Sequence, residues 1–429
     1  MSVGSKIAGV GSLARTANAA LTGGLEKKIQ SLDPAAVAAG GIPAIVLGIL
    51  TAIFVIVTIV CSFEFETSAN IARKAQLALK PYLPYGTKEG ERNSMDKSLT
   101  KYASSTPKER LILTNFYIQT ANVAGLLQSG DRSVASLDAV RFALLGGARA
   151  FVFDLWPDTE PGDAQHGPVL LTMEPGSMCR RTSYNSIPFV SVLSQLLYVA
   201  YQAKYNSTSN DPLIIYLRFR YPANKSGPRA DTMEMTARSL QATIQPYRLD
   251  ASFNKCRAQP TIPMLPLSVF ARKVIVVSNT NGANTSLADY INIAPEGGIP
   301  VEMAKTFAVT VIPTGTAANT DGMRNAINTI KQNLTFVAPM GEDPDAFGNG
   351  WDIKGAQSLG VHCCAMNMDP SKLPPAVAKD FKDDSFILKP AALQYAPTRL
   401  PPPQAAPDFK FGSGATAGSI AAPSMASPF

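Results

Sequence analysis

Two residues of opposite charge lie in runs that are otherwise apolar. Asp154 follows Phe153 in AFVFDLW (150–156), and Arg218 follows Leu217 in PLIIYLRF (212–219). A carboxylate in a buried strand is costly unless it binds a metal ion, takes up a proton or pairs with a cation. The two runs are therefore candidate positions for metal binding, acid–base chemistry or an ion pair.

Histidine, the side chain most often used as a general acid or base, is scarce in this chain. The sequence contains two, His166 in QHG and His362 in the apolar run VHCCAMNM. We expect His362 to lie in the core. The five cysteines have no CxxC or Cys/His spacing that suits zinc, so they are expected to be buried thiols and no zinc centre is predicted.

Strand-like and helical patterns alternate between about residues 106 and 392. The apolar runs are ILTNFYI, ARAFVFDLW, PLIIYLRF, KVIVVS, FAVTVI, VHCCAMNM and SFILKP. Such alternation predicts an α/β fold with a parallel sheet, either doubly wound or closed into a barrel. No GxGxxG or phosphate-binding loop follows any of the strands, which gives nucleotide binding no support. Lys and Arg are scattered despite a net charge of +7, so we expect no nucleic-acid partner.

One segment has the length and composition of a membrane span. Residues 42–63, IPAIVLGILTAIFVIVTIVCSF, contain no charged side chain, and roughly 20 apolar residues cross a hydrocarbon core. This predicts one transmembrane helix, a single-pass membrane location and a lipid bilayer as partner. Residues 1–41 form a Gly/Ala-rich N-terminal segment, and 64–105 a connector. Residues 393–429 form a Pro/Gly/Ser-rich tail with too few apolar residues to fold alone.

In their order along the chain, the apolar runs resemble the catalytic barrel of the phosphoinositide-specific phospholipase C family. NFYIQTAN (115–122) resembles the first strand of that family, which ends in Ser-His-Asn. GARAFVFDLWPD (147–158) resembles the strand written with Glu-Leu-Asp before Cys-Trp-Asp. IKQNLTFVAPMG (330–341) resembles the Leu-Ser-Arg-x-Tyr-Pro segment, and DDSFILKPAAL (383–393) the last barrel strand.

The resemblance implies a distorted TIM (β/α)8-type barrel over residues 106–392, preceded by the transmembrane helix. It divides the barrel into an X-like half (106–220), a linker (221–261) and a Y-like half (262–392). It also implies hydrolysis of a phosphodiester by two histidines with the help of calcium. Every residue with a role in that reaction can therefore be compared with the matching position of this chain.

The catalytic pair is incomplete at the matching positions. The first histidine of the family is replaced by Ala121, which can neither donate nor accept a proton, whereas His166 falls at the second. Glu174 or Asp163 would have to supply the missing base. This departure predicts a pseudoenzyme in which His166 is a relic of the catalytic pair.

The calcium ligands are depleted in the same way. Asn122 and Asp154 match two ligands of the family, but Val152 and Arg218 replace two others. Calcium prefers six to eight oxygen ligands and a net negative site, and a guanidinium opposes both. We therefore expect the calcium site to be lost and no cofactor to be bound.

The groups that would hold the substrate phosphates are also missing. Phe336 and Ala338 stand where the family has an Arg and a Tyr, and Val277 and Asn279 stand where it has lysines. Headgroup phosphates would lack charged partners at these positions. Binding of an inositol phosphate in spite of these changes would indicate a lipid-headgroup sensor instead.

Strand geometry predicts a new use for the two charged residues. Because side chains alternate along a strand, Val152 and Asp154 share one face, and Tyr216 and Arg218 share the matching face of another strand. If both faces point into the barrel, Arg218 replaces calcium as the counter-charge of Asp154. We predict a structural Asp154–Arg218 pair.

These observations predict a membrane-anchored, catalytically inactive phospholipase C-like protein that acts as a structural scaffold or binding module. Protein partners are expected to bind the barrel and the tails. The Gly/Ala-rich N-terminal segment, the membrane span, the inactivated enzyme fold and the Pro-rich tail together also suit a minor capsid protein of a large DNA virus. Such a protein would link inner membrane and shell and would be located in the virion inner membrane or in host endomembranes. The alternative is an active phosphodiesterase on phosphoinositide-type lipids with metal-independent chemistry, since metal-free bacterial relatives place an Arg where calcium would sit.

Overall fold

The computed structural model describes residues 51–53, 68–83, 92–130, 132–157, 168–172, 182–202, 208–221, 228–253, 262–294, 320–339 and 345–396. The chain divides into two compact units, Met1–Ala72 and Arg73–Phe429. The predicted membrane span 42–63 lies outside the described residues except for 51–53, as do segment 1–41 and most of the tail. Among the helices that are described, none combines the length and the apolar character needed to cross a bilayer.

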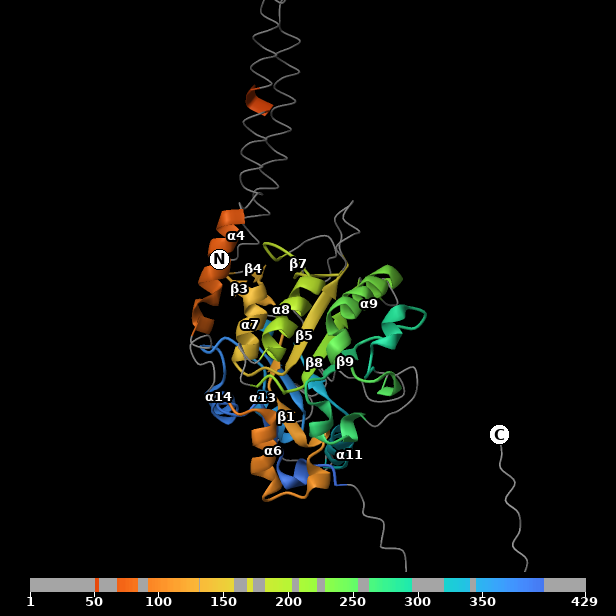
Figure 1. Cartoon of the computed structure of the whole chain (residues 1–429). Coiled ribbons are helices and arrows are strands. Elements are labelled where there is room, and N and C mark those ends of the chain that lie inside the picture. The colour runs from red at the N-terminus through yellow and green to blue at the C-terminus, as the bar shows by residue number, and fades with distance from the viewer. Residues whose placement is uncertain are drawn as a thin grey trace, which may run out of the picture. The chain divides into compact units, whose positions relative to one another are not determined.

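A mainly parallel sheet forms the centre of the second unit (Figure 1). Its parallel strands follow the order β10-β11-β2-β5-β8-β9, and β6 and β7 extend one end of β5 in antiparallel pairing. The α/β class predicted from the sequence is therefore confirmed. The bounds are β2 (Thr120–Ala121), β5 (Ala150–Trp156), β6 (Val169–Leu170), β7 (Ile187–Pro188), β8 (Leu213–Phe219), β9 (Val274–Ser278), β10 (Phe336–Val337) and β11 (Cys363–Met366).

The predicted closed barrel is not found in the described part of the chain. There the sheet ends at β9 on one side and at β10 on the other, with no pairing between them. The run FAVTVI (307–312), which was expected to supply a strand between these two in sequence, lies outside the described residues. The described strands thus form an open sheet.

The run SFILKP also differs from the expected last barrel strand. It forms β12 (Phe386–Leu388), which pairs antiparallel with β1 (Phe116–Ile118), so that Phe116 lies opposite Leu388. The parallel orientation predicted for this run is wrong. An apolar run indicates a strand but not its direction, which is set here by the pairing with β1.

One face of the sheet, here called the inner face, carries the main hydrophobic core. Alternate residues of the strands, among them Val152, Tyr216 and Val277, belong to one buried cluster. The opposite face packs on helices, where Phe153 contacts Phe189 edge-to-face with ring centroids 5.6 Å apart. Helices α7 (Leu137–Leu145), α8 (Phe189–Tyr201) and α9 (Ala230–Ile244) lie along this face (Figure 1).

The predicted connector contributes a helix to the domain. Helix α6 (Met95–Ala103) begins after Ser94, whose side chain accepts a hydrogen bond from the Lys97 amide and so caps the helix. Met95 is buried in the main core, and Leu99 and Tyr102 pack against it. The folded domain therefore includes residues before 106.

The remaining elements lie around the sheet. Among them are α4 (Ser68–Leu79), the short 3-10 helices η2 (Lys80–Tyr82) and η9 (Leu267–Phe270), the hairpin β3 (Leu126–Ser129) and β4 (Arg132–Ala135), α11 (Thr320–Gln332), α12 (Asp345–Gly348), α13 (Ile353–Ser358) and α14 (Pro375–Asp380).

Candidate functional site

Neighbouring parallel strands bring Asp154 and Arg218 together. The two residues lie opposite each other in the pairing of β5 with β8. The alternation that places Val152 and Tyr216 in the core places Asp154 and Arg218 on the same inner face, two residues further along. Both therefore lie near the carboxyl ends of their strands, where parallel α/β proteins usually carry their functional groups.

Arg218 holds Asp154 through both of its carboxylate oxygens. The Arg218 Nη2 donates to Asp154 Oδ2 at 3.0 Å, and the Arg218 Nε donates to Asp154 Oδ1. The side chains are only 1% and 2% exposed. Two charges so deeply buried are stable only when they are paired and their other hydrogen-bonding groups are satisfied.

Main-chain carbonyls satisfy the other donors of the guanidinium. The Arg218 Nη1 donates to the Ala338 carbonyl at 2.8 Å, and Nη2 also donates to the Pro339 carbonyl at 3.0 Å. The Asn122 Nδ2 donates to the same Pro339 carbonyl at 2.9 Å. Asn122, Asp154, Arg218, Ala338 and Pro339 thus form one buried polar cluster, which we name the Arg218 cluster. It joins β2, β5, β8 and the residues after β10.

Apolar side chains fill the positions where the family resemblance implies polar groups. Ala121, Val152, Phe336 and Ala338 are all almost completely buried. The Phe336 ring packs on the ring of Tyr216, with centroids 5.0 Å apart. These contacts belong to a packed core and leave the Arg218 cluster as the charged part of this region.

Asn279, at one of the phosphate-binding positions of the resemblance, has a structural role at the end of β8. Its Oδ1 accepts from the Phe219 amide at 2.9 Å, and its Nδ2 donates to the Phe219 carbonyl at 3.1 Å. Val277, the other such position, is fully buried. Neither residue offers a charge to a phosphate.

The residues around the Arg218 cluster do not fit a calcium ion. Both oxygens of Asp154 accept from Arg218, whose positive charge would repel a second cation. The Asn122 Oδ1 is a buried acceptor without a hydrogen-bond partner among the described residues. Within that same part of the chain, no three His, Cys, Asp or Glu side chains are grouped so that they could hold a metal ion.

The cavity beside Asn122 is small. Its volume is about 20 Å³, and Ala121, Asn122, Leu127 and Asn367 are among its lining residues. A volume of this order holds about one water molecule, whereas small-molecule sites commonly enclose about 300 Å³ or more. The cavity therefore has no room for an inositol phosphate.

Of the two histidines, the structure describes His362 but not His166. His166 lies outside the described residues, together with Asp163 and Glu174. His362 is buried, as expected, and its Nδ1 accepts from the Thr335 amide at 3.1 Å. Its Nε2 then carries the proton and donates to the Thr114 carbonyl at 2.8 Å. Burial, with the nearby Lys389 as a second cause, lowers the pKa of His362 well below its ordinary value. His362 is therefore a neutral structural residue.

The adjacent cysteines are unsuited to nucleophilic chemistry. Cys363 and Cys364 are free thiols buried in the core. Burial raises the pKa of Cys363 to about 12, so the reactive thiolate does not form near neutral pH. Their expected role as buried thiols agrees with this environment.

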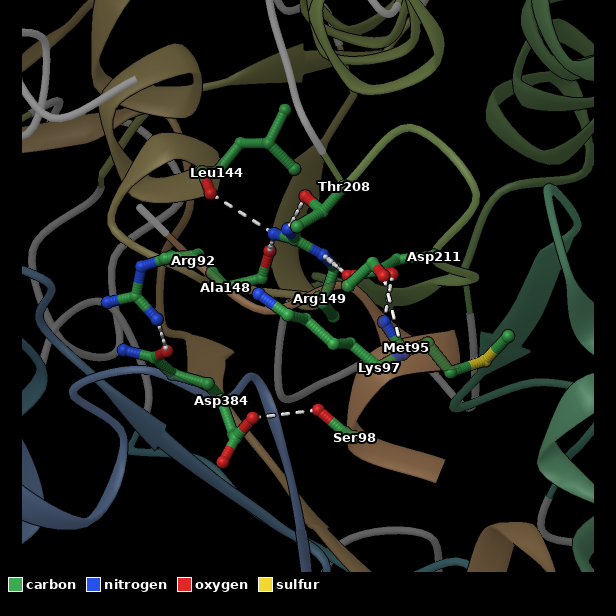
Figure 2. A network of polar contacts seen from close by, with 12 residues as sticks. Arg92, Met95, Lys97, Ser98, Leu144, Ala148, Arg149, Thr208, Asp211 and Asp384 are labelled. Carbon is green, nitrogen blue, oxygen red and sulfur yellow. Dashed lines mark hydrogen bonds and ion pairs between the residues drawn. The ribbon is translucent and has the colours of Figure 1, made fainter. Parts of the chain in front are cut away.

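A second buried ion pair lies at the opposite ends of β5 and β8 (Figure 2). The Arg149 Nε donates to Asp211 Oδ2 at 2.8 Å, with both side chains at most 2% exposed. Asp211 Oδ1 also accepts from the Met95 amide at 2.7 Å, which fastens the first turn of α6. This pair was not predicted from the sequence. Its signal was a charged residue shortly before each of two strands that pair with each other.

Comparisons with known proteins found solved structures of low sequence identity. No protein-family model and no curated protein sequence matches this chain. L. pealei PLC21 is similar with a TM-score of 0.49 and 14% identity, over 68% of this chain and 40% of that one. S. officinalis PLC21 has a TM-score of 0.49 and 14% identity, over 71% and 42%. These neighbours are phospholipase C structures.

A third neighbour is matched over almost its whole length. It is a calcium-dependent phosphoinositol-specific phospholipase C from Pseudomonas sp., a Gram-negative bacterium, with a TM-score of 0.37 and 12% identity. The match covers 63% of this chain and 95% of the bacterial one. This chain therefore covers nearly all of the bacterial protein but about two-fifths of the length of the two PLC21 chains.

Proposed function

We propose that this chain is a catalytically inactive, membrane-anchored phospholipase C-like protein that acts as a structural scaffold or binding module. The observation that carries the proposal is the buried Ala121, which offers no proton-transfer group at the position of the first histidine. The salt bridge between Asp154 and Arg218 argues in addition against the calcium-dependent reaction. Both carboxylate oxygens accept from the guanidinium, so the acid is committed to a structural bond. A carboxylate whose two oxygens are both engaged in this way is a poor metal ligand.

The surroundings of that salt bridge support the same conclusion. Hydrolysis of a phosphodiester needs a base for the attacking hydroxyl, an acid for the leaving group and positive charge at the phosphate. Ala121 offers no proton-transfer group, and Phe336 and Ala338 offer no charge. The cavity of about 20 Å³ beside Asn122 is too small for the substrate headgroup.

The proposed setting is a membrane that the chain crosses once through residues 42–63. An uncharged apolar run of this length supports the anchor. A domain beside the bilayer and a Pro-rich tail suit a protein that links a membrane to a surrounding shell. We therefore propose a minor capsid or membrane component of a virion as the biological form, with host endomembrane as the other location.

The direct test is phosphodiesterase activity of the purified full chain. Phosphatidylinositol and its phosphorylated forms would be offered in mixed micelles, once with calcium and once with a chelator. We expect no turnover above that of a matched His166→Ala variant in either condition. Turnover that is abolished by His166→Ala would contradict the proposal and would support the metal-independent phosphodiesterase.

A binding measurement separates a scaffold from a headgroup sensor. Isothermal titration of the full chain with soluble inositol phosphates should give no heat above dilution, because the phosphate-binding positions carry Val277 and Asn279. Saturable binding without turnover would replace the scaffold by a sensor of inositol phosphates. The double variant Asp154→Leu with Arg218→Met is informative in that case, since it removes the buried cation without leaving Asp154 unpaired.

A further inference from the structure

Residues 73–83, in α4 and η2, carry an exposed stripe of cationic and apolar side chains. Its members are Arg73, Leu77, Lys80 and Leu83, which we name the α4 surface. Their spacing of three or four residues places them on one side of a helix. Leu77 is 62% exposed and Leu83 54%, which makes them two of the most exposed large apolar side chains in the described part of the chain.

The other side of the same segment is attached to the domain. Leu79 and Tyr82 are buried, and the Tyr82 hydroxyl donates to Asn367 Oδ1 at 2.7 Å. The Lys74 Nζ lies 3.7 Å from the centre of the Tyr184 ring. These contacts fix which side of the helix faces outward. The α4 surface is therefore exposed on a helix whose other side is held in place.

The charge of the segment selects the kind of partner. Residues 68–83, SANIARKAQLALKPYL, contain Arg73, Lys74 and Lys80 and no acidic residue. Leucines flanked by cations on one helical face are typical of helices that lie in the interface of an anionic bilayer. The apolar groups enter the headgroup region while the cations contact lipid phosphates and carboxylates.

The position of the segment in the chain favours a bilayer over a protein partner. The apolar run that is proposed to cross the membrane ends at Phe63, and α4 begins at Ser68. Five residues span at most about 18 Å even when fully extended. A chain anchored through 42–63 therefore has its α4 close to the headgroups.

We propose that the α4 surface binds the anionic lipid surface of the membrane in which the chain is anchored. Leu77 and Leu83 enter the interface, and Arg73 and Lys80 contact anionic headgroups. This inference rests on the membrane anchor of the proposed function, but it concerns a separate contact. Its consequence is that the domain is held against one leaflet in a fixed orientation.

A tryptophan reporter in the full chain tests the contact. Leu77→Trp would be reconstituted in vesicles with brominated acyl chains, with or without phosphatidylserine as about a third of the lipid. We expect bromine quenching of the added tryptophan only when phosphatidylserine is present. Val269→Trp is the matched control, because Val269 is 47% exposed but lies in η9, before the amino end of β9. Its emission should not respond to the lipid.

Charge variants test the role of the cations. Each cation near an anionic surface strengthens membrane association by about fivefold, so Arg73→Gln with Lys80→Gln should shift the Leu77→Trp reporter toward its free form by about 25-fold. High salt should have the same effect. Lys97→Gln, which removes an exposed cation from α6, should leave the quenching unchanged.

Three results would overturn the proposal. Equal quenching in vesicles without phosphatidylserine, unaffected by the charge variants, would show that anionic lipid is not recognised. Absence of quenching in both vesicles would exclude the bilayer as occupant, and a concentration-dependent blue shift without lipid would identify a second copy instead. Flotation of the protein with the vesicles after a carbonate wash shows separately whether residues 42–63 anchor the chain in the bilayer. If the anchor fails, the soluble chain mixed with the same vesicles gives the same quenching comparison.

Discussion

Arg218 is the single residue whose replacement is expected to be most costly for stability. Arg218→Glu would place a second carboxylate beside Asp154 and remove the donors to the Ala338 and Pro339 carbonyls. Breaking a buried pair from one side typically costs about 3–5 kcal/mol. Urea denaturation should therefore show a loss of at least this size. An unchanged unfolding midpoint would mean that the pair does not stabilise the domain.

A double variant distinguishes the contribution of the ion pair to stability from the contributions of its two side chains. Asp154→Leu together with Arg218→Met replaces both charges by apolar groups, which often restores much of the stability that either single replacement loses. We expect the double variant to unfold at a higher denaturant concentration than Asp154→Leu alone or Arg218→Met alone. Additive losses would show that the two side chains act independently.

His362 should make the domain sensitive to mild acid. Burial lowers its pKa well below the ordinary value of 6.5, so the unfolded chain takes up a proton before the folded chain does. The contribution of neutral His362 to stability is thus present above pH 6.5 and is lost as the pH falls below it. The measurement is the unfolding free energy between about pH 7 and 5, where carboxylates with ordinary pKa values contribute little.

The second histidine provides the control for that measurement. The chain has two histidines, His166 and His362. His362→Gln should flatten the decline in stability between about pH 7 and 5, whereas in His166→Gln, which keeps His362, the decline should persist. A decline that survives His362→Gln would assign the acid sensitivity to other groups.

For single residues, the sequence predicted which side chains meet but not which main-chain groups they contact. Alternation along two apolar runs was enough to predict that Asp154 and Arg218 share a face, and the structure places them in contact. The carbonyls of Ala338 and Pro339 gave no such signal, because every residue has one. That they reach Arg218 depends on the course of the chain after β10, which no local pattern specifies.

At the scale of elements, α6 depends on the second buried ion pair. Asp211 accepts from both the Arg149 side chain and the Met95 amide, so Asp211→Ala leaves a buried guanidinium unpaired and frees the first turn of α6. We expect a loss of about 3–5 kcal/mol. Amide hydrogen exchange in residues 95–103 should also become faster relative to the strands.

Lys97→Ala is the matched control for that variant. Lys97 lies in the same turn of α6 but is exposed. Such a surface replacement usually changes stability by no more than about 0.5 kcal/mol. Equal acceleration of exchange in α6 for both variants would show that Asp211 does not fasten the helix.

The sequence of α6 carries a helical pattern that was not used to predict it as part of the domain. MDKSLTKYA was assigned to the connector, yet Met95, Leu99 and Tyr102 are spaced as one helical face and Ser94 is a good N-cap. The direction of β12 is a different case. Three residues, Phe386–Leu388, indicate a strand, but nothing within them specifies an antiparallel partner more than two hundred residues earlier.

At the scale of the whole molecule, calcium should not stabilise the protein. A ligand at a hundred times its dissociation constant raises the unfolding free energy by about 2.7 kcal/mol, which is readily measured. We expect the full chain to unfold at the same temperature in excess calcium and in excess chelator, because both oxygens of Asp154 accept from Arg218, whose charge would repel the ion. A rise that is specific for calcium and absent with magnesium would contradict this.

The order of elements was predictable because it follows the order of the apolar runs. The arrangement of the strands in space was not, since β5 pairs with β2 and β8, and β11 inserts beside β2 from the far end of the sequence. Such pairings are set by packing between distant segments, not by local pattern. The resemblance to phospholipase C supplied an expected order, and its last strand differed.

The pairing of β1 with β12 has a consequence for how the protein folds during synthesis. Phe116 can pair with Leu388 only after nearly the whole domain has been synthesised. The Asn115 carbonyl likewise can accept from the Lys389 amide only then. Contacts between such distant residues slow folding. A nascent chain already inserted in a membrane through residues 42–63 would hold an unfinished domain beside the bilayer until then, with β1 unpaired and open to wrong partners.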